Sequence, residues 1–374
     1  MNDFLCFDQK NQNLARMCNC SHRHSIHCIV PPYMTDQLVQ SSNPEVRARA
    51  LATVKISSAL RAERQFSQAF PSLRAYSFAA EQGKDRVIYD ARQTDRLKNV
   101  IVRREGQEAG NDVAVNEAYD YSGDTYDFYE SIFQRNSLDD RGMTLISAVH
   151  VAEPDYRGGF VPMNNAFWNG ELMAYGDGDG IIFNRFTQSL DVVGHELTHG
   201  VQSFTSNLTY YGQPGALNEH FSDVFGILIR QWKKQEEAKT ANWTIGSEVL
   251  VSAATRQGIR DMLNPGKAYV DDPDLGTDPQ PGHMNDLYTG PYDNNGVHIN
   301  SGIPNRVFAL VATELGGNAW DVAGRIWYDT MLQLTSSGQF KDCAKLTIQI
   351  AGSQFGEAEK KVVSNAWKTV GLSI

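Results

Sequence analysis

The feature that most constrains the fold is a pair of histidines four residues apart in the run DVVGHELTHGVQSF, residues 191–204. On a helix, His195 and His199 lie on one face, one above the other, so that both imidazoles can reach a single metal ion. An apolar stripe at helical spacing lies on the other side of this helix: Val193, Leu197, Val201 and Phe204. The sequence therefore predicts a helix near 190–204 that packs on one side and presents imidazoles on the other.

A catalytic zinc site needs a third protein ligand, since HExxH also occurs on ordinary helices. A third histidine in the pattern HExxHxxGxxH would stand at position 205, which is Thr205, and Gln202 replaces the glycine. The run GALNEHFSDVFGILI, residues 215–229, supplies Glu219 instead, with Asp223 one helical turn further. These two acids alone would indicate a solvated face, but after HELTH they are better interpreted as a ligand and a supporting carboxylate.

The remaining pattern predicts an α+β fold. The runs RVIYD, NVIVRR and LISAVHV predict strands between about 86 and 186, and VNEAYDYSGDTYDFYESIF predicts a helix. Further helices are expected at 190–204, 216–236, 304–315, 318–333, 340–354 and 357–370, with a long Gly/Pro/Asp/Asn-rich loop at 261–302. We therefore expect a strand-rich N-terminal lobe and a mainly helical C-terminal lobe, with the active-site cleft between them.

Composition and charge exclude several classes of partner. The net charge is −10 and no long Lys/Arg block occurs, so neither nucleic acid nor a membrane surface is expected as a partner. No run of about 18 apolar residues predicts a transmembrane helix. The first residues contain no continuous apolar segment of a secretory signal, which favours synthesis in the cytoplasm and export by a route without one. Only Cys343 lies beyond residue 28, so the main body has no internal disulfide.

Four motifs together resemble those of the thermolysin-like zinc metalloproteases. NNAFWNGELMAYGDGDG, DVVGHELTHGVQSF, GALNEHFSDVFG and DNNGVHINSGIPN follow the family's pattern in the family's order, and the resemblance extends from about residue 87 to the C-terminus. It implies a metalloendopeptidase with one catalytic zinc. His195, His199 and Glu219 would be the zinc ligands, and Asp223 and Asn218 would orient the two imidazoles.

The resemblance also implies the catalytic groups. Zinc would activate a water molecule, and Glu196 would take its proton as general base and deliver it to the leaving amine. Tyr210 and His298, the latter held by Asp293, would stabilise the oxyanion. Asn165, the Ala166 carbonyl and Arg260 would hold the substrate backbone. Phe183, Val192 and Ile259 would line a pocket that prefers a bulky apolar residue after the scissile bond.

Other functions fit these residues less well, among them a zinc-finger adaptor based on the N-terminal Cys/His run, which the acidic charge and the large body do not suit. A zinc aminopeptidase would need an anchor for the free amine of its substrate, and no GAMEN-type motif is present. A protease-like binding protein without activity would be expected to have lost Glu196, Tyr210 or His298, and the chain has all three.

The chain departs from the family at the double calcium site. Asp191 is retained, but Arg230 occupies the next acidic position, and Asn242, Thr244 and Ser247 stand where carboxylates would be. Because calcium needs several charged oxygens, we expect the double calcium site to be absent.

The front of the chain resembles the short propeptide of the protealysin-like subgroup. This implies a latent precursor with a propeptide at 1–80 (its boundary between about 65 and 84), followed by catalytic lobes at 81–205 and 206–374. Pro31 and Pro32 predict an extended inhibitory segment that blocks the substrate cleft, with Tyr33 and Met34 in its pockets. A helix near 44–64, begun by Asn43 and Pro44, would anchor it.

The run CNCSHRHSIHC, residues 18–28, places six metal-ligand side chains within this front segment. Three interpretations remain open for it: adventitious metal binding only, a second zinc site, or a cysteine that occupies the open position of the catalytic zinc.

Overall fold

The computed structural model describes residues 27–54, 83–155 and 158–374. Most of the Cys/His-rich run, together with residues 55–82, lies outside the described residues. The helix expected near 44–64 begins at residue 44 and is described as far as residue 54.

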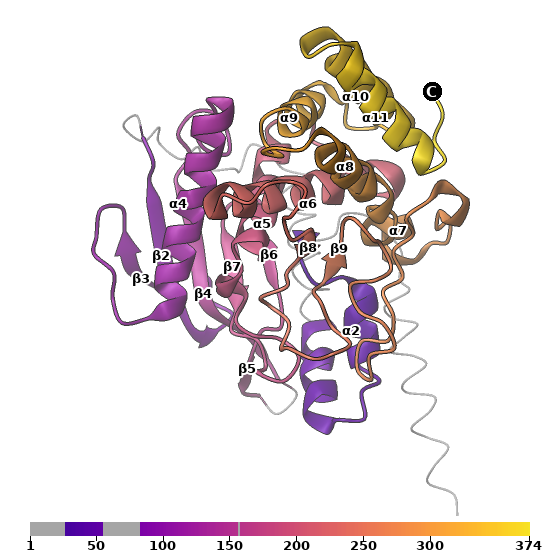
Figure 1. The fold of residues 1–374 in the computed structure, drawn as a ribbon. Coiled ribbons are helices and arrows are strands. Elements are labelled where there is room, and N and C mark those ends of the chain that lie inside the picture. Colours follow the sequence, from indigo (N-terminus) through magenta and orange to yellow (C-terminus); the bar gives the residue numbers. More distant parts are fainter. Residues whose placement is uncertain (1–26, 55–82, 156–157) are drawn as a thin grey trace, which may run out of the picture.

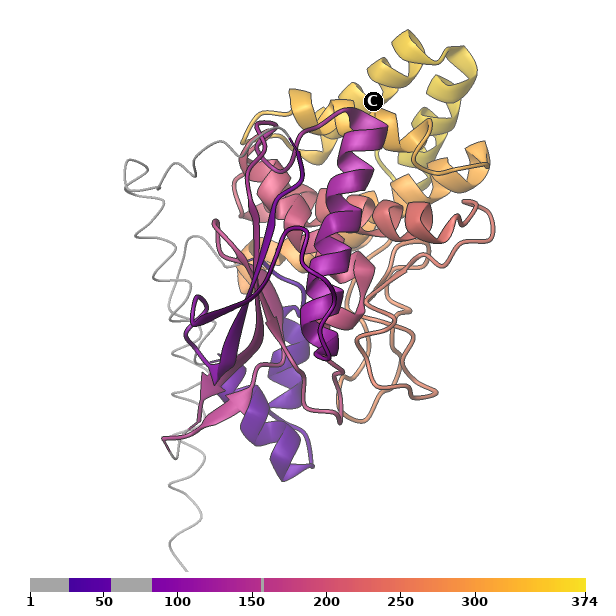
Figure 2. The same cartoon turned by 90° about the vertical axis from the view of Figure 1, so that its left-hand side faces the viewer.

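The N-terminal lobe is built on a seven-stranded mixed sheet. Six strands follow the order β1-β6-β7-β4-β2-β3, and the seventh, β5, pairs with β4 outside this order. The strands are β1 (His27–Cys28), β2 (Arg86–Thr94), β3 (Val100–Arg104), β4 (Leu145–Pro154), β5 (Phe160–Pro162), β6 (Ala166–Trp168) and β7 (Met173–Gly176). Helix α4 (Val113–Phe133) packs along β2 and β4 (Figures 1 and 2). The side chain of Asp112 begins α4 by accepting hydrogen bonds from the backbone of Ala114 and Val115.

Helix α5 (Leu190–Ser203) ends the N-terminal lobe, and the C-terminal lobe is mainly helical, as expected. The helices of the C-terminal lobe are α6 (Gly212–Lys234), α7 (Tyr292–Asn300), α8 (Gly302–Leu315), α9 (Ala323–Gln333), α10 (Phe340–Gln354) and α11 (Glu357–Thr369). Two short 3-10 helices (Phe186–Gln188 and Met284–Asp286) and a hairpin of β8 (Thr244–Ile245) with β9 (Arg260–Asp261) complete the described elements. Helices α8–α11 gather on the far side of α6 from the sheet (Figure 1).

Close packing of α5 on α6 positions the metal-binding motifs. A Cβ atom on Gly226 would lie 2.5 Å from the carbonyl oxygen of Asp191 and 3.0 Å from the backbone nitrogen of His195. Only glycine therefore allows α6 to approach the first turns of α5 this closely. The approach brings the helix of the histidines against the helix of Glu219.

Two boundaries differ from the expected pattern. Helix α9 begins at Ala323 instead of 318, because residues 318–321 form a hydrogen-bonded turn. Helix α7 lies within the segment expected to be a loop, and its residues Asp293, Asn294, Asn295 and Gly296 have positive φ angles between 52° and 76°. Asp, Asn and Gly are the residues that tolerate this conformation, so the composition that predicted a loop instead encodes a left-handed turn.

Residues 27–54, called here the N-terminal segment, pack against both lobes. Strand β1 pairs with β6 and forms the edge of the sheet, and α2 (Pro32–Leu38) lies near β9 in Figure 1. The expectation that Pro31 and Pro32 are extended is correct for Pro31, which has a ψ angle of 155°, and wrong for Pro32. Pro32 begins α2 because the first position of a helix needs no N–H donor. The extended residues are therefore those just before Pro32.

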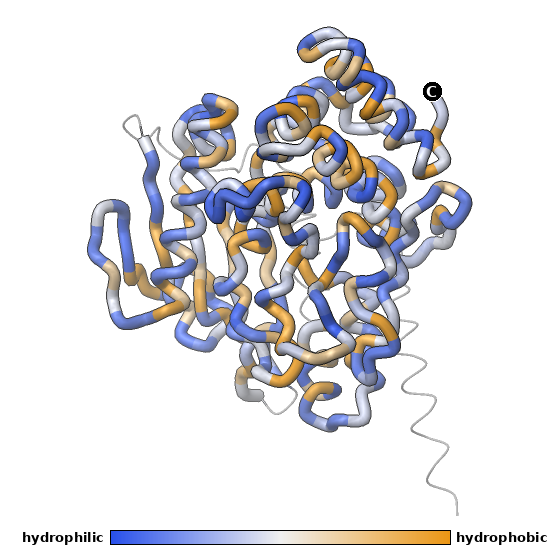
Figure 3. Tube along the Cα trace, viewed as in Figure 1, coloured by the Kyte–Doolittle hydropathy of each residue, from blue (hydrophilic) through white to orange (hydrophobic). Residues whose placement is uncertain are grey.

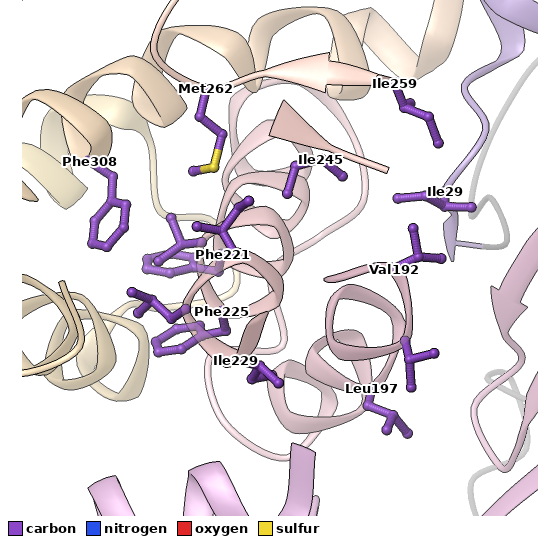
Figure 4. Packing of buried hydrophobic residues seen from close by; sticks show 14 of the residues in the cluster. Ile29, Val192, Leu197, Phe221, Phe225, Ile229, Ile245, Ile259, Met262 and Phe308 are labelled. Carbon is purple, nitrogen blue, oxygen red and sulfur yellow. The ribbon is translucent and has the colours of Figure 1, made fainter. Parts of the chain in front are cut away.

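A large apolar core connects the two lobes. Along most helices the tube in Figure 3 alternates between hydrophobic and hydrophilic residues, as expected for helices with one face in the core. Figure 4 shows side chains from the N-terminal segment, α5, α6 and β8 close together, and all of them belong to one buried cluster. The N-terminal segment contributes Ile29, Met34 and Leu38 to this cluster.

Candidate active site

Three buried side chains from two helices converge on one point. His195 and His199 of α5 and Glu219 of α6 are each fully buried, and their ligand atoms all lie within 4.8 Å of one another. The two Nε2 atoms are 3.1 Å apart. They lie 3.6 Å (His195) and 3.5 Å (His199) from the carboxylate oxygens of Glu219. The structure thus brings together the three predicted ligands.

The partners of the outer ring nitrogens show what the site can hold. His199 Nδ1 lies 2.7 Å from Oδ1 of Asn218, an acceptor, and His195 Nδ1 lies 2.8 Å from the carboxylate of Asp223. With a proton on each Nδ1, both Nε2 atoms direct lone pairs at the same point. Among the described residues, nothing donates a hydrogen bond to Oε2 of Glu219. Two imidazole nitrogens and one carboxylate suit zinc, and the donor set therefore fits that ion.

Asp223 and Arg260 form a buried ion pair behind the histidines. Arg260 donates from Nε and Nη2 to the two oxygens of Asp223 at 2.8 and 2.7 Å. Burial alone would raise the pKa of Asp223, but Arg260 and His195 lower it far below its usual range. Asp223 therefore stays ionised and keeps the acceptor that orients His195.

Glu196 lies next to the three ligands and is also fully buried. The backbone N–H of Trp168 on β6 donates to Glu196 Oε2 at 3.0 Å, which links this carboxylate to the strand that pairs with β1. Burial and the negative charge of Glu219 raise the pKa of Glu196 well above its usual value. A divalent cation beside it would act in the opposite direction.

Tyr210, His298 and Asp293 form a chain of contacts on the other side of Glu219. The Tyr210 hydroxyl donates to Glu219 and lies 3.1 Å from His298 Nε2. His298 Nδ1 lies 2.6 Å from Asp293, whose other oxygen accepts from the His298 backbone at 2.7 Å. Burial alone would lower the pKa of His298, but Glu219 and Asp293 raise it to about 9. This shift favours the protonated ring, which donates from both nitrogens.

The groups predicted to hold a substrate backbone contact the N-terminal segment. The Ala166 carbonyl accepts from the Ile29 N–H at 3.3 Å, and Asn165 Oδ1 accepts from the Val30 N–H at 3.2 Å. Arg260 Nη1 donates to the Ile29 carbonyl at 3.0 Å. The three pocket residues Phe183, Val192 and Ile259 are fully buried, in one cluster with Ile29. Figure 4 shows Ile29 between Val192 and Ile259.

Sequence reasoning missed several groups at this site. Ser222 Oγ lies 2.9 Å from His199 Nδ1, and Gln280 Nε2 donates to the carbonyl of His298 at 2.6 Å. Ser222 follows Asn218 by four residues on α6, so helical spacing contained a signal for it. Gln280 and Ile29 reach the site only through the tertiary fold, and no local pattern marks them.

Arg230 occupies the place where the family's calcium ligands were expected. Its Nη1 lies 2.5 Å from Asp191 and 2.9 Å from the Thr244 carbonyl, and its Nη2 donates to the Asn242 carbonyl. The guanidinium and Asp191 are both buried.

Family models and curated relatives point to a single family. Residues 72–203 match the thermolysin metallopeptidase catalytic domain, and residues 206–372 match the thermolysin metallopeptidase alpha-helical domain. An extracellular metalloprotease of Pectobacterium carotovorum subsp. carotovorum is 44% identical over 348 residues, covering 92% of this chain and 96% of the relative. Protease PrtS of Photorhabdus sp. (strain Az29) is 42% identical over 350 residues, 92% of each chain.

A solved structure resembles the whole arrangement, N-terminal segment included. The precursor of protealysin, a metalloproteinase from Serratia proteamaculans, matches with a TM-score of 0.82 and 43% identity. The match covers 93% of this chain and 100% of the other. The predicted two-lobed fold preceded by a small propeptide is thus confirmed, and the chain belongs to the thermolysin family of zinc metallopeptidases, within its protealysin-like group.

Proposed function

We propose that the chain is a zinc endopeptidase that cleaves proteins before bulky apolar residues. The observation that carries this proposal is the convergence of His195, His199 and Glu219 next to the buried carboxylate of Glu196. Zinc bound by these three residues would supply Lewis acidity that polarises a carbonyl group and acidifies a water molecule.

Protein groups around this point divide the remaining work. Glu196 accepts the proton of the attacking water and returns it to the leaving amine. Tyr210 and His298 donate to the oxygen that becomes negative in the transition state, and Asp293 holds the His298 ring in place. Because these donors are buried, their interaction with developing charge is stronger than it would be in water.

Substrate recognition follows from the contacts of the N-terminal segment. Asn165, the Ala166 carbonyl and Arg260 already bind an extended backbone there, so they would hold a substrate in the same way. Phe183, Val192 and Ile259 enclose an apolar side chain, which favours such a residue after the scissile bond.

Residues 1 to about 80 would act as a propeptide that keeps this precursor latent, with catalytic lobes at 81–205 and 206–374. Its residues from Cys28 to Met34 occupy the substrate site or pack beside it, which supports inhibition through packing. The matched relative from Pectobacterium is named an extracellular metalloprotease, so we infer action outside the cell. No helix among the described residues is long and apolar enough to cross a membrane.

Replacing Glu196 tests this function. Glu196→Gln keeps the shape of the side chain but cannot accept the proton, so kcat on an unstructured protein should fall 10²-fold or more after the N-terminal segment has been trimmed by an added protease. Elemental analysis should still find zinc in the variant. Glu357→Gln on exposed α11 is the control and should retain full activity. Retention of more than about a tenth of kcat by Glu196→Gln would contradict the proposed base.

A further inference from the structure

The N-terminal segment lies across the active site in the manner of a substrate. Strand β1 runs antiparallel to β6, with His27 opposite Trp168 and Cys28 opposite Phe167. The next two residues continue this pairing through the Ile29 N–H to the Ala166 carbonyl and the Val30 N–H to Asn165. Arg260 binds the Ile29 carbonyl at 3.0 Å. An inhibitor that only covered the entrance would not need all of these backbone contacts.

Ile29 occupies the position of the residue after the scissile bond. Its side chain is fully buried with Val192 and Ile259, two of the residues that line the pocket for that substrate residue (Figure 4). The carbonyl on its C-terminal side is held by Arg260, and the N–H on its N-terminal side faces the strand edge. The register therefore places the peptide bond between Cys28 and Ile29 at the reaction centre.

The proposed general base is held by the strand that pairs with both residues of that bond. Glu196 accepts a hydrogen bond from the backbone N–H of Trp168 at 3.0 Å. The two residues before Trp168 on β6 are Phe167, which is paired with Cys28, and Ala166, whose carbonyl accepts from the Ile29 N–H. The group that would protonate the leaving nitrogen is therefore attached to the strand segment that holds this nitrogen.

We propose that the precursor hydrolyses its own Cys28–Ile29 peptide bond, an inference that rests on the proposed function. Water adds across the C–N bond: its oxygen joins the Cys28 carbonyl carbon, and one of its protons reaches the Ile29 nitrogen through Glu196. The products are a carboxylate at Cys28 and a new amino terminus at Ile29. No oxidant, reductant or other co-reactant is required.

The cut does not by itself release the inhibitor. Met34 and Leu38 of α2 remain in the core after cleavage, as does Ile29. Ser41 donates to Asp274 at 2.6 Å, and Thr53 donates to Glu153 at 2.9 Å, so residues beyond α2 are also attached to the catalytic lobes. Cleavage therefore removes the Cys/His-rich residues 1–28 and leaves a clipped precursor that is still inhibited.

The test follows the full-length precursor, loaded with one equivalent of zinc at neutral pH, by intact mass and by labelling of new amino termini. We expect an Ile29 terminus to appear with a first-order rate that does not change over a tenfold range of protein concentration. The Glu196→Gln precursor should produce none. Ile29→Leu should be cut at the same bond, whereas Ile29→Gly, which leaves the pocket empty, should be cut at least tenfold more slowly.

An assay of trimmed enzyme from the same preparation on an unstructured protein distinguishes failure of the self-cleavage proposal from failure of the proposed function. Trimming removes residue 29, so all variants at this position give the same trimmed enzyme. The activity of that enzyme therefore tests the proposed function and not the self-cleavage. Active trimmed enzyme together with an uncut wild-type precursor overturns the self-cleavage while the function stands. Inactive trimmed enzyme overturns the function. A rate that rises with protein concentration, or a Glu196→Gln precursor that is cut equally well, shows that another molecule makes the cut and overturns the inference.

Discussion

At the scale of single residues, the site depends on groups that orient the metal ligands. Asn218 and Ser222 both face Nδ1 of His199, at 2.7 and 2.9 Å, and the Asn218 oxygen accepts the proton that this nitrogen carries. With the proton on Nδ1, the lone pair of Nε2 is free to bind zinc. The residues that contact Nδ1, Asn218 and Ser222, therefore affect how tightly the ring binds the ion.

Asn218→Ala should lower zinc affinity, because the His199 ring loses the acceptor that holds its orientation. A loss of about 10- to 100-fold is expected for such partners. Competition with a chromogenic chelator measures it, and Asn318→Ala, which removes an exposed asparagine bound only to Asp321, is the matched control. Equal zinc affinity in the two variants would show that Ser222 alone is sufficient.

We propose that Arg230 takes the place of a calcium ion. Its buried guanidinium binds Asp191 and the carbonyl groups of Thr244 and Asn242. Arg230→Ala leaves Asp191 buried without its cation, which should lower the free energy of unfolding by about 3–5 kcal/mol in urea titrations. Lys234→Ala on the same helix breaks an exposed pair with Glu248 and should change it by less than about 1 kcal/mol.

Calcium should not stabilise the wild-type chain if Arg230 takes its place. A melting series over increasing calcium at constant zinc checks this, because any ion that binds only the folded state raises the midpoint. A marked rise at micromolar calcium would mean that other oxygens form a site elsewhere.

At the scale of elements, the helix at 44–54 buries a carboxyl group of β4. Glu153 is 2% exposed and accepts a hydrogen bond from Thr53. Burial raises the pKa of Glu153 from 4.5 to about 8. The packed precursor therefore binds this proton more tightly than a form in which Glu153 is exposed to water.

Precursor stability should consequently fall as the pH rises from about 5 to about 8, because the unfolded chain loses the Glu153 proton in this range whereas the packed form keeps it. Urea midpoints at pH 5.5 and 8.5 measure the change. Glu153→Gln, which can still accept from Thr53, should flatten this dependence, whereas the exposed change Glu45→Gln should not. Parallel pH profiles for wild type and Glu153→Gln would contradict the assignment.

At the scale of the whole molecule, latency arises because one chain supplies both the enzyme and an occupant of its active site. The N-terminal segment buries Ile29, Met34 and Leu38 in the core shared by both lobes. Each fully buried apolar side chain contributes about 1.5–3 kcal/mol, so packing alone can hold the segment without a metal–thiolate bond.

Met34→Asp should weaken this packing and let the untrimmed precursor hydrolyse an unstructured substrate at least several-fold faster than wild type. Gln40→Asp changes an exposed residue two positions beyond the end of α2 and is the control. Cys28→Ala should remain latent. A fully active Cys28→Ala precursor beside a silent Met34→Asp precursor would show that a thiolate, and not packing, blocks the zinc.

The sequence alone determined the parts that depend on short-range spacing. The ligand triad was recognisable because four-residue steps on a helix place side chains on one face, and HELTH with Glu219 satisfies the needs of one ion. Alternation and helical periodicity likewise predicted β2, β3, β4 and most helices of the C-terminal lobe, because each element must bury one apolar face.

Only the tertiary structure decided which distant groups meet. No local pattern shows that Ile29 enters the pocket of Val192 and Ile259, that Gln280 supports His298, or that Thr53 covers Glu153. The paired prolines were compatible with either an extended segment or the start of a helix, and the packing of Met34 and Leu38 into the core selected the helix for Pro32 onward. Such choices depend on burial against residues far away in the chain, and local conformational preference cannot specify them.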